Sequence, residues 1–235
     1  MAPLSEPGSV RRILVAHGTR SAHGVAMVRE LAAAVAGRTG PLDVAFVDVL
    51  GPSPSDLLRE SDIPTVLVPA FLAAGYHVHT DVPGHVARSG HARAVVTAPL
   101  GPDPALVGAL VRRLDGAGLR PDDRVVLGAT GSSDARARGD VRIMAGHLGA
   151  RLGRDVPVGF LAAGEPTVAE TVARIRTSGA RVVIAAYQLA DGLFHARLME
   201  TGADAVAAPL GLAPEVIDLL VARFAAGAAE LAQTR

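Results

Sequence analysis

The chain has 235 residues, of which 49% are hydrophobic and 20% charged, and this is enough to build a substantial core. Basic and acidic residues balance at 23 each, aromatic residues make up only 3% and cysteine is absent, which argues against a nucleic-acid partner and excludes disulfides, thiolate catalysis and cysteine-bound metal. The first nine residues lack the apolar stretch of a signal peptide and no apolar run could span a membrane, so we expect a cytoplasmic protein with no membrane partner.

Strands and helices are expected to alternate through the first half of the chain. Short apolar runs that end in Gly, Pro or polar residues predict strands at 12–16, 43–49, 65–72 and 94–98. Helical spacing of apolar residues predicts helices at 22–36, 55–61, 83–89 and 105–114, with Ser55 as the N-cap of the second. This alternation is typical of right-handed βαβ units around a parallel sheet.

The second half of the chain repeats the first after a polar linker at 115–123. The segment 125–132 resembles 13–19, and 182–189 resembles 66–72, at a spacing of about 115 residues. Such a period in a chain of this length indicates duplication of one α/β unit. We therefore predict two similar domains, 1–118 and 119–235, each with a parallel sheet flanked by helices, and a cleft between them.

Two histidines and a carboxylate follow the buried strand at 65–72, in the stretch Gly75-Tyr76-His77-Val78-His79-Thr80-Asp81-Val82-Pro83. Ligands bind at the carboxyl ends of strands in open α/β sheets. If this stretch is extended, His77, His79 and Asp81 share one face. Imidazole and carboxylate together suit a divalent ion such as Fe, Co, Ni or Zn. The alternative is a polar loop whose histidines cap backbone groups.

The two halves differ at the positions that could bind metal. Three such side chains lie at the carboxyl ends of expected strands in the first half, and in the repeat they pair with residues that are not ligands: His17 with Thr130, Asp48 with Ala162, and His77 with Phe194. The three first-half residues could converge at one sheet edge. All three are replaced at the matching positions of the second half, which favours a metal site in the first half. The alternative is that Thr, Ala and Phe simply repack a diverged copy.

The segments His17-Gly18-Thr19-Arg20 and Pro69-Ala70-Phe71-Leu72-Ala73-Ala74-Gly75-Tyr76-His77-Val78-His79-Thr80-Asp81-Val82-Pro83, with the duplication, resemble the sirohydrochlorin chelatases, which include CbiX-type cobaltochelatases and SirB-type ferrochelatases. The resemblance covers nearly the whole chain. It implies a chelatase-like fold of two Rossmann-like halves that hold a tetrapyrrole in their cleft. The implied activity is that of a lyase inserting Fe²⁺ or Co²⁺ into sirohydrochlorin, in sirohaem or cobalamin biosynthesis. The metal would be a substrate, with no permanently bound cofactor, and a monomer is expected because one chain supplies both halves.

The resemblance also implies roles for individual residues. His17 and His77 match the family histidines that bind the incoming metal and act on the macrocycle. Asp48 would hold the ion together with these histidines; it lies where the family commonly has a Glu, which reaches one methylene further. His79, at a variable position of the motif, would be an auxiliary ligand. Asp81 matches the motif's Asp and would be either a ligand or an N-cap. A neutral imidazole can hold a metal transiently and accept a proton, and a small ligand set lets the ion leave.

An octacarboxylate substrate would need cationic partners. Arg20 follows the first turn, and Arg136 and Arg138 follow its counterpart in the second half, although each could instead be a solvated surface residue. The other histidines match no motif and are expected to be surface or packing residues. A non-catalytic carrier of metal or tetrapyrrole is the alternative function. A metal-dependent hydrolase or a dinucleotide-binding domain is disfavoured, because neither His-Glu-x-x-His nor Gly-x-Gly-x-x-Gly is present.

Overall fold

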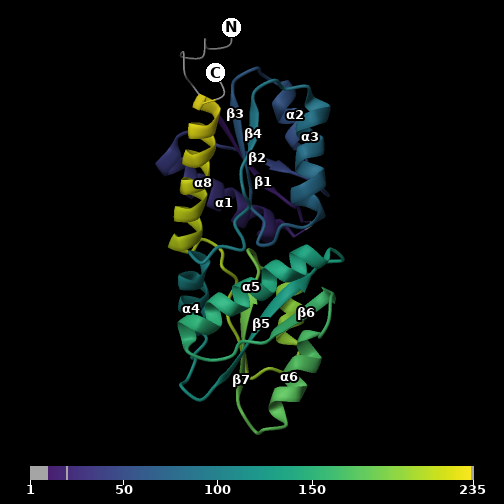
Figure 1. Cartoon of the computed structure of the whole chain (residues 1–235), viewed down its shortest axis with the longest axis vertical. Helices are drawn as coiled ribbons and strands as arrows, with labels where there is room; N and C mark the ends of the chain where they lie inside the picture. The colour runs from purple at the N-terminus through teal and green to yellow at the C-terminus, as the bar shows by residue number, and fades with distance from the viewer. Residues whose placement is uncertain (1–9, 20, 234–235) are drawn as a thin grey trace. The chain divides into compact units, whose positions relative to one another are not determined.

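The computed structural model describes residues 10–19 and 21–233 and confirms the predicted α/β fold (Figure 1). Within these residues the strands form two parallel sheets of four strands each. The first sheet has the order β2-β1-β3-β4 and the second the order β6-β5-β7-β8. The second half of the chain therefore repeats the topology of the first, as a gene-duplicated unit should.

The helices and strands of the first half lie close to the predicted ranges. They are β1 (Arg11–Ala16), α1 (Ala22–Thr39), β2 (Asp43–Phe46), α2 (Pro54–Arg59), β3 (Thr65–Pro69), the π-helical turn η1 (His77–Asp81), α3 (Val82–Ser89), β4 (Ala94–Val96) and α4 (Leu106–Gly116). Those of the second half are β5 (Arg124–Gly131), α5 (Ala135–Leu152), β6 (Val158–Ala163), α6 (Val168–Arg176), β7 (Val182–Tyr187), α7 (Leu193–Met199), β8 (Ala205–Val206) and α8 (Pro214–Gln233).

One central strand of each sheet is buried along its whole length. Every residue of β3 and of β7 is buried, which explains why these strands read as continuous apolar runs rather than alternating ones. In the first sheet, Ile13 and Leu67 pack with Leu58 of α2 and Val82 of α3. In the second, Val126 and Ile184 belong to the corresponding cluster with α6. Each sheet thus has a hydrophobic core of its own.

The compact units of the structure differ from the sequence repeats 1–118 and 119–235. The first unit contains the described residues up to Phe71, Tyr76–Leu100 and the C-terminal residues from Ile217 onward, and the second contains Leu72–Gly75 and Gly101–Val216. Helix α4, from the first repeat, therefore packs in the second unit, and most of α8, from the second repeat, packs in the first. The final helices of the two repeats are exchanged, and in Figure 1 the yellow α8 runs beside the first sheet.

Helix α2 begins earlier than the sequence predicted. Its N-cap is Ser53, whose hydroxyl accepts a hydrogen bond from the backbone N–H of Asp56, and the carboxylate of Asp56 accepts one from the N–H of Ser53. The prediction of Ser55 as the cap is wrong, because a Ser followed by Pro54 and then Asp56 makes the stronger helix start. Ser55 is instead buried inside the helix.

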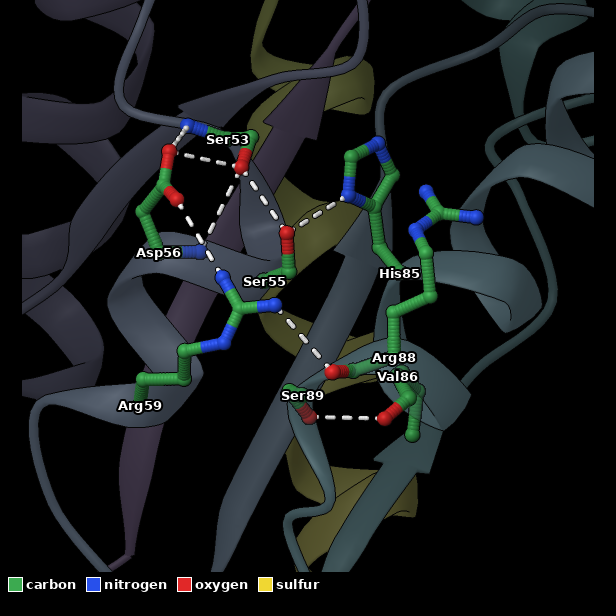
Figure 2. Close-up of polar contacts among 8 residues, drawn as sticks. All are labelled: Ser53, Ser55, Asp56, Arg59, His85, Val86, Arg88 and Ser89. Atoms are coloured by element: carbon green, nitrogen blue, oxygen red, sulfur yellow. Dashed lines mark hydrogen bonds and ion pairs between the residues drawn. The ribbon is translucent and has the colours of Figure 1, made fainter.

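Two hydrogen bonds join α2 to α3 (Figure 2). The hydroxyl of Ser55 lies 3.0 Å from Nδ1 of His85, and the guanidinium of Arg59 donates to the backbone carbonyl of Arg88 over 3.1 Å. Burial lowers the pKa of His85, and the neighbouring Arg88 lowers it further. His85 is therefore a packing residue, as the absence of a motif around it predicted.

Among the described residues, no helix combines the length and the apolar character needed to cross a membrane.

Candidate active site

His17 is the first exposed residue after the buried end of β1. Its backbone carbonyl accepts a hydrogen bond of 3.0 Å from the N–H of Asp48, so the loop after β1 is tied to the loop after β2. Gly18 has a φ of +94°, and a Cβ on it would lie 2.0 Å from the carbonyl oxygen of Asp48. Only glycine fits this close approach of two backbones, and it turns the chain so that the imidazole of His17 stays at the sheet edge.

His77 begins the π-helical turn that follows β3. The turn closes with a hydrogen bond from the N–H of Val82 to the carbonyl of His77. The segment is therefore not extended, and the single face that an extended segment would give His77, His79 and Asp81 does not form. The helical turn instead brings residues four apart together, and Nδ1 of His77 lies 2.5 Å from a carboxylate oxygen of Asp81.

The structure brings His17 and His77 together, as predicted. Their ring centroids are 4.5 Å apart and the ring planes meet at 80°. This proximity follows from the topology, because β1 and β3 are hydrogen-bonded neighbours and their carboxyl ends lie at the same edge of the sheet. Two imidazoles at this separation suit transient binding of a borderline divalent ion.

The other predicted ligands do not join this pair in the structure. The exposed carboxylate of Asp48 accepts a hydrogen bond of 2.7 Å from the N–H of Val49, within its own loop. His79 is exposed on the π-helical turn. Nowhere in the described part of the chain do three or more His, Asp or Glu side chains form a group that could hold a metal ion. The arrangement is therefore a histidine pair rather than a closed metal site.

Asp81 contacts His77, a partner that the sequence analysis did not name. It immediately precedes α3, yet its side chain makes no capping hydrogen bond to that helix. Its carboxylate contacts His77 instead, so the interpretation of Asp81 as an N-cap is wrong. The spacing His-x-x-x-Asp was the signal for this contact, but it becomes informative only once the segment is known to be helical.

Two aromatic side chains also contact the ring of His77. The ring of Phe71 stacks on it with centroids 6.1 Å apart and an interplanar angle of 11°, and the ring of Tyr76 meets it edge-on at 5.9 Å. Both were part of the motif, but sequence reasoning assigned them no role.

The four residues before Tyr76 belong to the second unit. The N–H of Ala74 donates to the carboxylate of Asp140 over 2.7 Å, and the hydroxyl of Tyr187 donates to the carbonyl of Leu72 over 2.7 Å. Burial raises the pKa of Tyr187, so this hydroxyl keeps its proton and acts as a donor. The segment Leu72–Gly75, between β3 and the π-helical turn, is thus fixed by two specific hydrogen bonds.

The predicted arginines have unequal surroundings. Arg20 lies outside the described residues. Arg136 is 70% exposed and forms an ion pair of 3.1 Å with Asp134, the N-cap of α5. Arg138 donates to the carbonyls of Ser132 and Ser133, so its guanidinium already stabilises the turn after β5.

Comparison with known proteins identifies the family of the chain that carries this histidine pair. The CbiX family model matches residues 11–117 and, a second time, residues 124–226. The chain belongs to the CbiX family. The two matches follow the internal duplication, and the first includes both His17 and His77.

Solved structures share the fold of this CbiX family chain. SirB from Bacillus subtilis with Fe³⁺ is 22% identical, with a TM-score of 0.83 over 94% of this chain and 96% of that one. The cobalt complex of SirB from Bacillus subtilis subspecies spizizenii is 19% identical, with a TM-score of 0.77 over 93% and 95%. CbiX, the terminal enzyme of siroheme biosynthesis in denitrifying bacteria, is 24% identical, with a TM-score of 0.70 over 92% and 98%. No curated protein matches the chain significantly in sequence.

Proposed function

We propose that this chain is a sirohydrochlorin chelatase that inserts Fe²⁺ or Co²⁺ into the tetrapyrrole, in sirohaem or cobalamin biosynthesis. The observation that carries the proposal is the pair of imidazoles, His17 and His77, held 4.5 Å apart at adjacent strand ends in a chain of the CbiX family. The solved SirB structures with Fe³⁺ and with cobalt support the choice of metals. The metal is a substrate here and not a resident cofactor.

The histidine pair suits the chemistry of insertion. The ion must lose its water and the macrocycle must lose its pyrrole N–H protons, so the site needs groups that bind metal briefly and accept protons near neutral pH. In this proposal His17 and His77 hold the ion, and His77 also takes up a proton. Two protein ligands leave most coordination positions open to the incoming pyrrole nitrogens, which a closed structural site would block.

Asp48 and His79 are proposed as auxiliary ligands. Both are exposed, and the backbone hydrogen bond between Asp48 and His17 keeps the Asp48 loop beside the histidine pair. To reach the ion, the Asp48 carboxylate would exchange its hydrogen bond with the N–H of Val49 for a metal bond. Arg20, Arg136 and Arg138 are proposed to bind substrate carboxylates.

The test is anaerobic incubation of the purified protein with sirohydrochlorin and either Fe²⁺ or Co²⁺, following the absorbance of the macrocycle. We expect many turnovers per protein molecule, and a loss of about 100-fold or more in His77→Ala, because that variant lacks both a ligand and a proton acceptor. His147→Ala changes an exposed histidine of α5 and should keep the wild-type rate. The ratio of the wild-type insertion rates with Fe²⁺ and with Co²⁺ ranks the two metals.

Two results would count against the proposal. Full insertion activity in His77→Ala would remove the assigned role of the histidine. Binding of one equivalent of sirohydrochlorin or metal without turnover would favour the alternative function, a non-catalytic carrier.

A further inference from the structure

We propose that Asp81 is a positioning residue that fixes His77 in a single tautomer, with the proton on Nδ1 and the lone pair of Nε2 free for the reaction. This inference rests on the proposed function only for what Nε2 then binds. The contact itself is direct, since Nδ1 of His77 lies 2.5 Å from Oδ2 of Asp81. An ionised carboxylate only accepts hydrogen bonds, so the imidazole must be the donor and Nδ1 must carry the hydrogen.

The backbone conformation at this position favours the contact. The segment forms a single π-helical turn, closed from the N–H of Val82 to the carbonyl of His77. Pro83 follows at the start of α3 and has no N–H to continue regular α-helical bonding toward His79. Single π-helical turns of this kind are frequent at functional sites. Here the turn places the side chains of His77 and Asp81 next to each other on one face.

The remaining sides of the imidazole are restricted by other rings. Phe71 stacks on one face, Tyr76 lies at an edge, and His17 approaches at 80°. With Nδ1 occupied by Asp81, Nε2 is the nitrogen left to bind metal or accept a proton. The side chains of His77 and Asp81 are 34% and 26% exposed, so the hydrogen bond is partly shielded while the ring stays accessible. Carboxylates that orient metal-binding histidines in this way raise the basicity of the ligand and fix its direction.

The second half of the chain provides an internal comparison. His195 and Asp191 are also four residues apart, but there the carboxylate precedes the histidine and lies 3.7 Å from Nε2 rather than from Nδ1. The carboxylate of Asp191 therefore lies near Nε2 of its histidine, whereas in His77 the carboxylate contacts Nδ1 and leaves Nε2 free. Asp191 is a matched control for Asp81, because it is an aspartate at the same spacing from a histidine in the second unit.

The first arm of the test measures the tautomer in the full, metal-free chain labelled with ¹⁵N and ¹³C in histidine. The His77 signals are assigned by their loss in His77→Gln. At a pH where imidazole is neutral, we expect ring shifts of the Nδ1–H tautomer in the wild type. In Asp81→Asn the amide can donate to Nδ1, so the shifts should move toward the Nε2–H tautomer. Asp191→Asn should leave the His77 signals unchanged, and a wild-type His77 protonated on Nε2 would overturn the proposal.

The second arm measures function. Asp81→Asn should lower kcat for insertion and the affinity for Co²⁺ by about 10- to 100-fold, the usual effect of losing an orienting carboxylate, with little change in KM for sirohydrochlorin. Asp81→Glu keeps the acceptor and should recover part of the loss. Unchanged Co²⁺ affinity in Asp81→Asn would overturn the positioning role even if the tautomer shifts. If the wild type inserts no metal, the proposed function fails, while the tautomer and the Co²⁺ titration still decide the role of Asp81.

Discussion

At the scale of single residues, the same close backbone approach supports both halves of the chain. Gly18 and Gly131 both have positive φ, and a Cβ on either would lie 2.0 Å from the carbonyl oxygen of the facing loop, that of Asp48 or Ala163. The turn after the first strand of each repeat is thus built alike. In the first repeat it positions His17, whereas the second repeat keeps the turn without a metal-binding side chain.

Gly18→Ala should lower the free energy of unfolding by about 2 kcal/mol or more, because the new methyl group adds left-handed strain and collides with the backbone of the Asp48 loop. Chemical denaturation measures the change. Gly37→Ala is the control: Gly37 lies in α1 with open space around it, and the substitution should stabilise by about 0.5–1 kcal/mol. If Gly18→Ala and the wild type were equally stable, the close approach of the Gly18 and Asp48 backbones would not contribute to stability.

At the scale of elements, α8 packs closely on the first sheet. A Cβ on Gly227 would lie 2.5 Å from a methyl carbon of Val66 in β3 and 2.8 Å from one of Thr97. Arg223 donates to the carbonyl of Pro99, and Arg38 of α1 forms an ion pair with Asp218 of α8. The small residue at 227 lets the helix approach the sheet, at the expense of helix propensity.

Gly227→Ala should therefore destabilise the protein by about 1–3 kcal/mol, although helix propensity alone would make it stabilising by about 1 kcal/mol. The comparison is Gly146→Ala, in the middle of α5, where nothing lies within 4 Å of the added methyl and propensity should prevail. Thermal or chemical unfolding of the two variants should give changes of opposite sign. Stabilisation by both would mean that α8 has room to move away from β3.

At the scale of the whole molecule, the repeat in the sequence is not the compact unit of the structure. The buried residues of α4, which include Leu106, Leu110 and Leu114, pack in the second unit, and α8 from Ile217 onward completes the first. Each repeat therefore donates its last helix to the other repeat's unit. A half-chain cut at the repeat boundary would lose one helix that its sheet needs and expose the apolar face of another.

A fragment of residues 1–118 should accordingly lack a cooperative unfolding transition and show poorly dispersed amide NMR signals. A second fragment, 1–100 joined through a short flexible linker to 214–235, restores α8 to the sheet and should give better dispersed amide NMR signals. A short linker is enough because Arg223 of α8 contacts the carbonyl of Pro99, next to the end of the first segment. A well-folded 1–118 would contradict the importance of the helix exchange.

Much of the fold and part of the site could be predicted from the sequence, because they depend on local periodicity and on chain topology. Buried runs such as the one ending at Pro69 predicted the parallel strands. The rule that parallel strand ends share one edge correctly placed His17 beside His77. The duplication was visible because each turn and apolar run recurs in order.

Only the tertiary structure decided the contacts that depend on exact backbone geometry and on docking between distant segments. The helical turn after Tyr76 brought the side chains of His77 and Asp81 into contact, because residues four apart are neighbours in a helix but far apart in an extended segment. The same holds for the exchange of α4 and α8. An apolar helix face shows that it must be buried, but its periodicity does not say against which sheet.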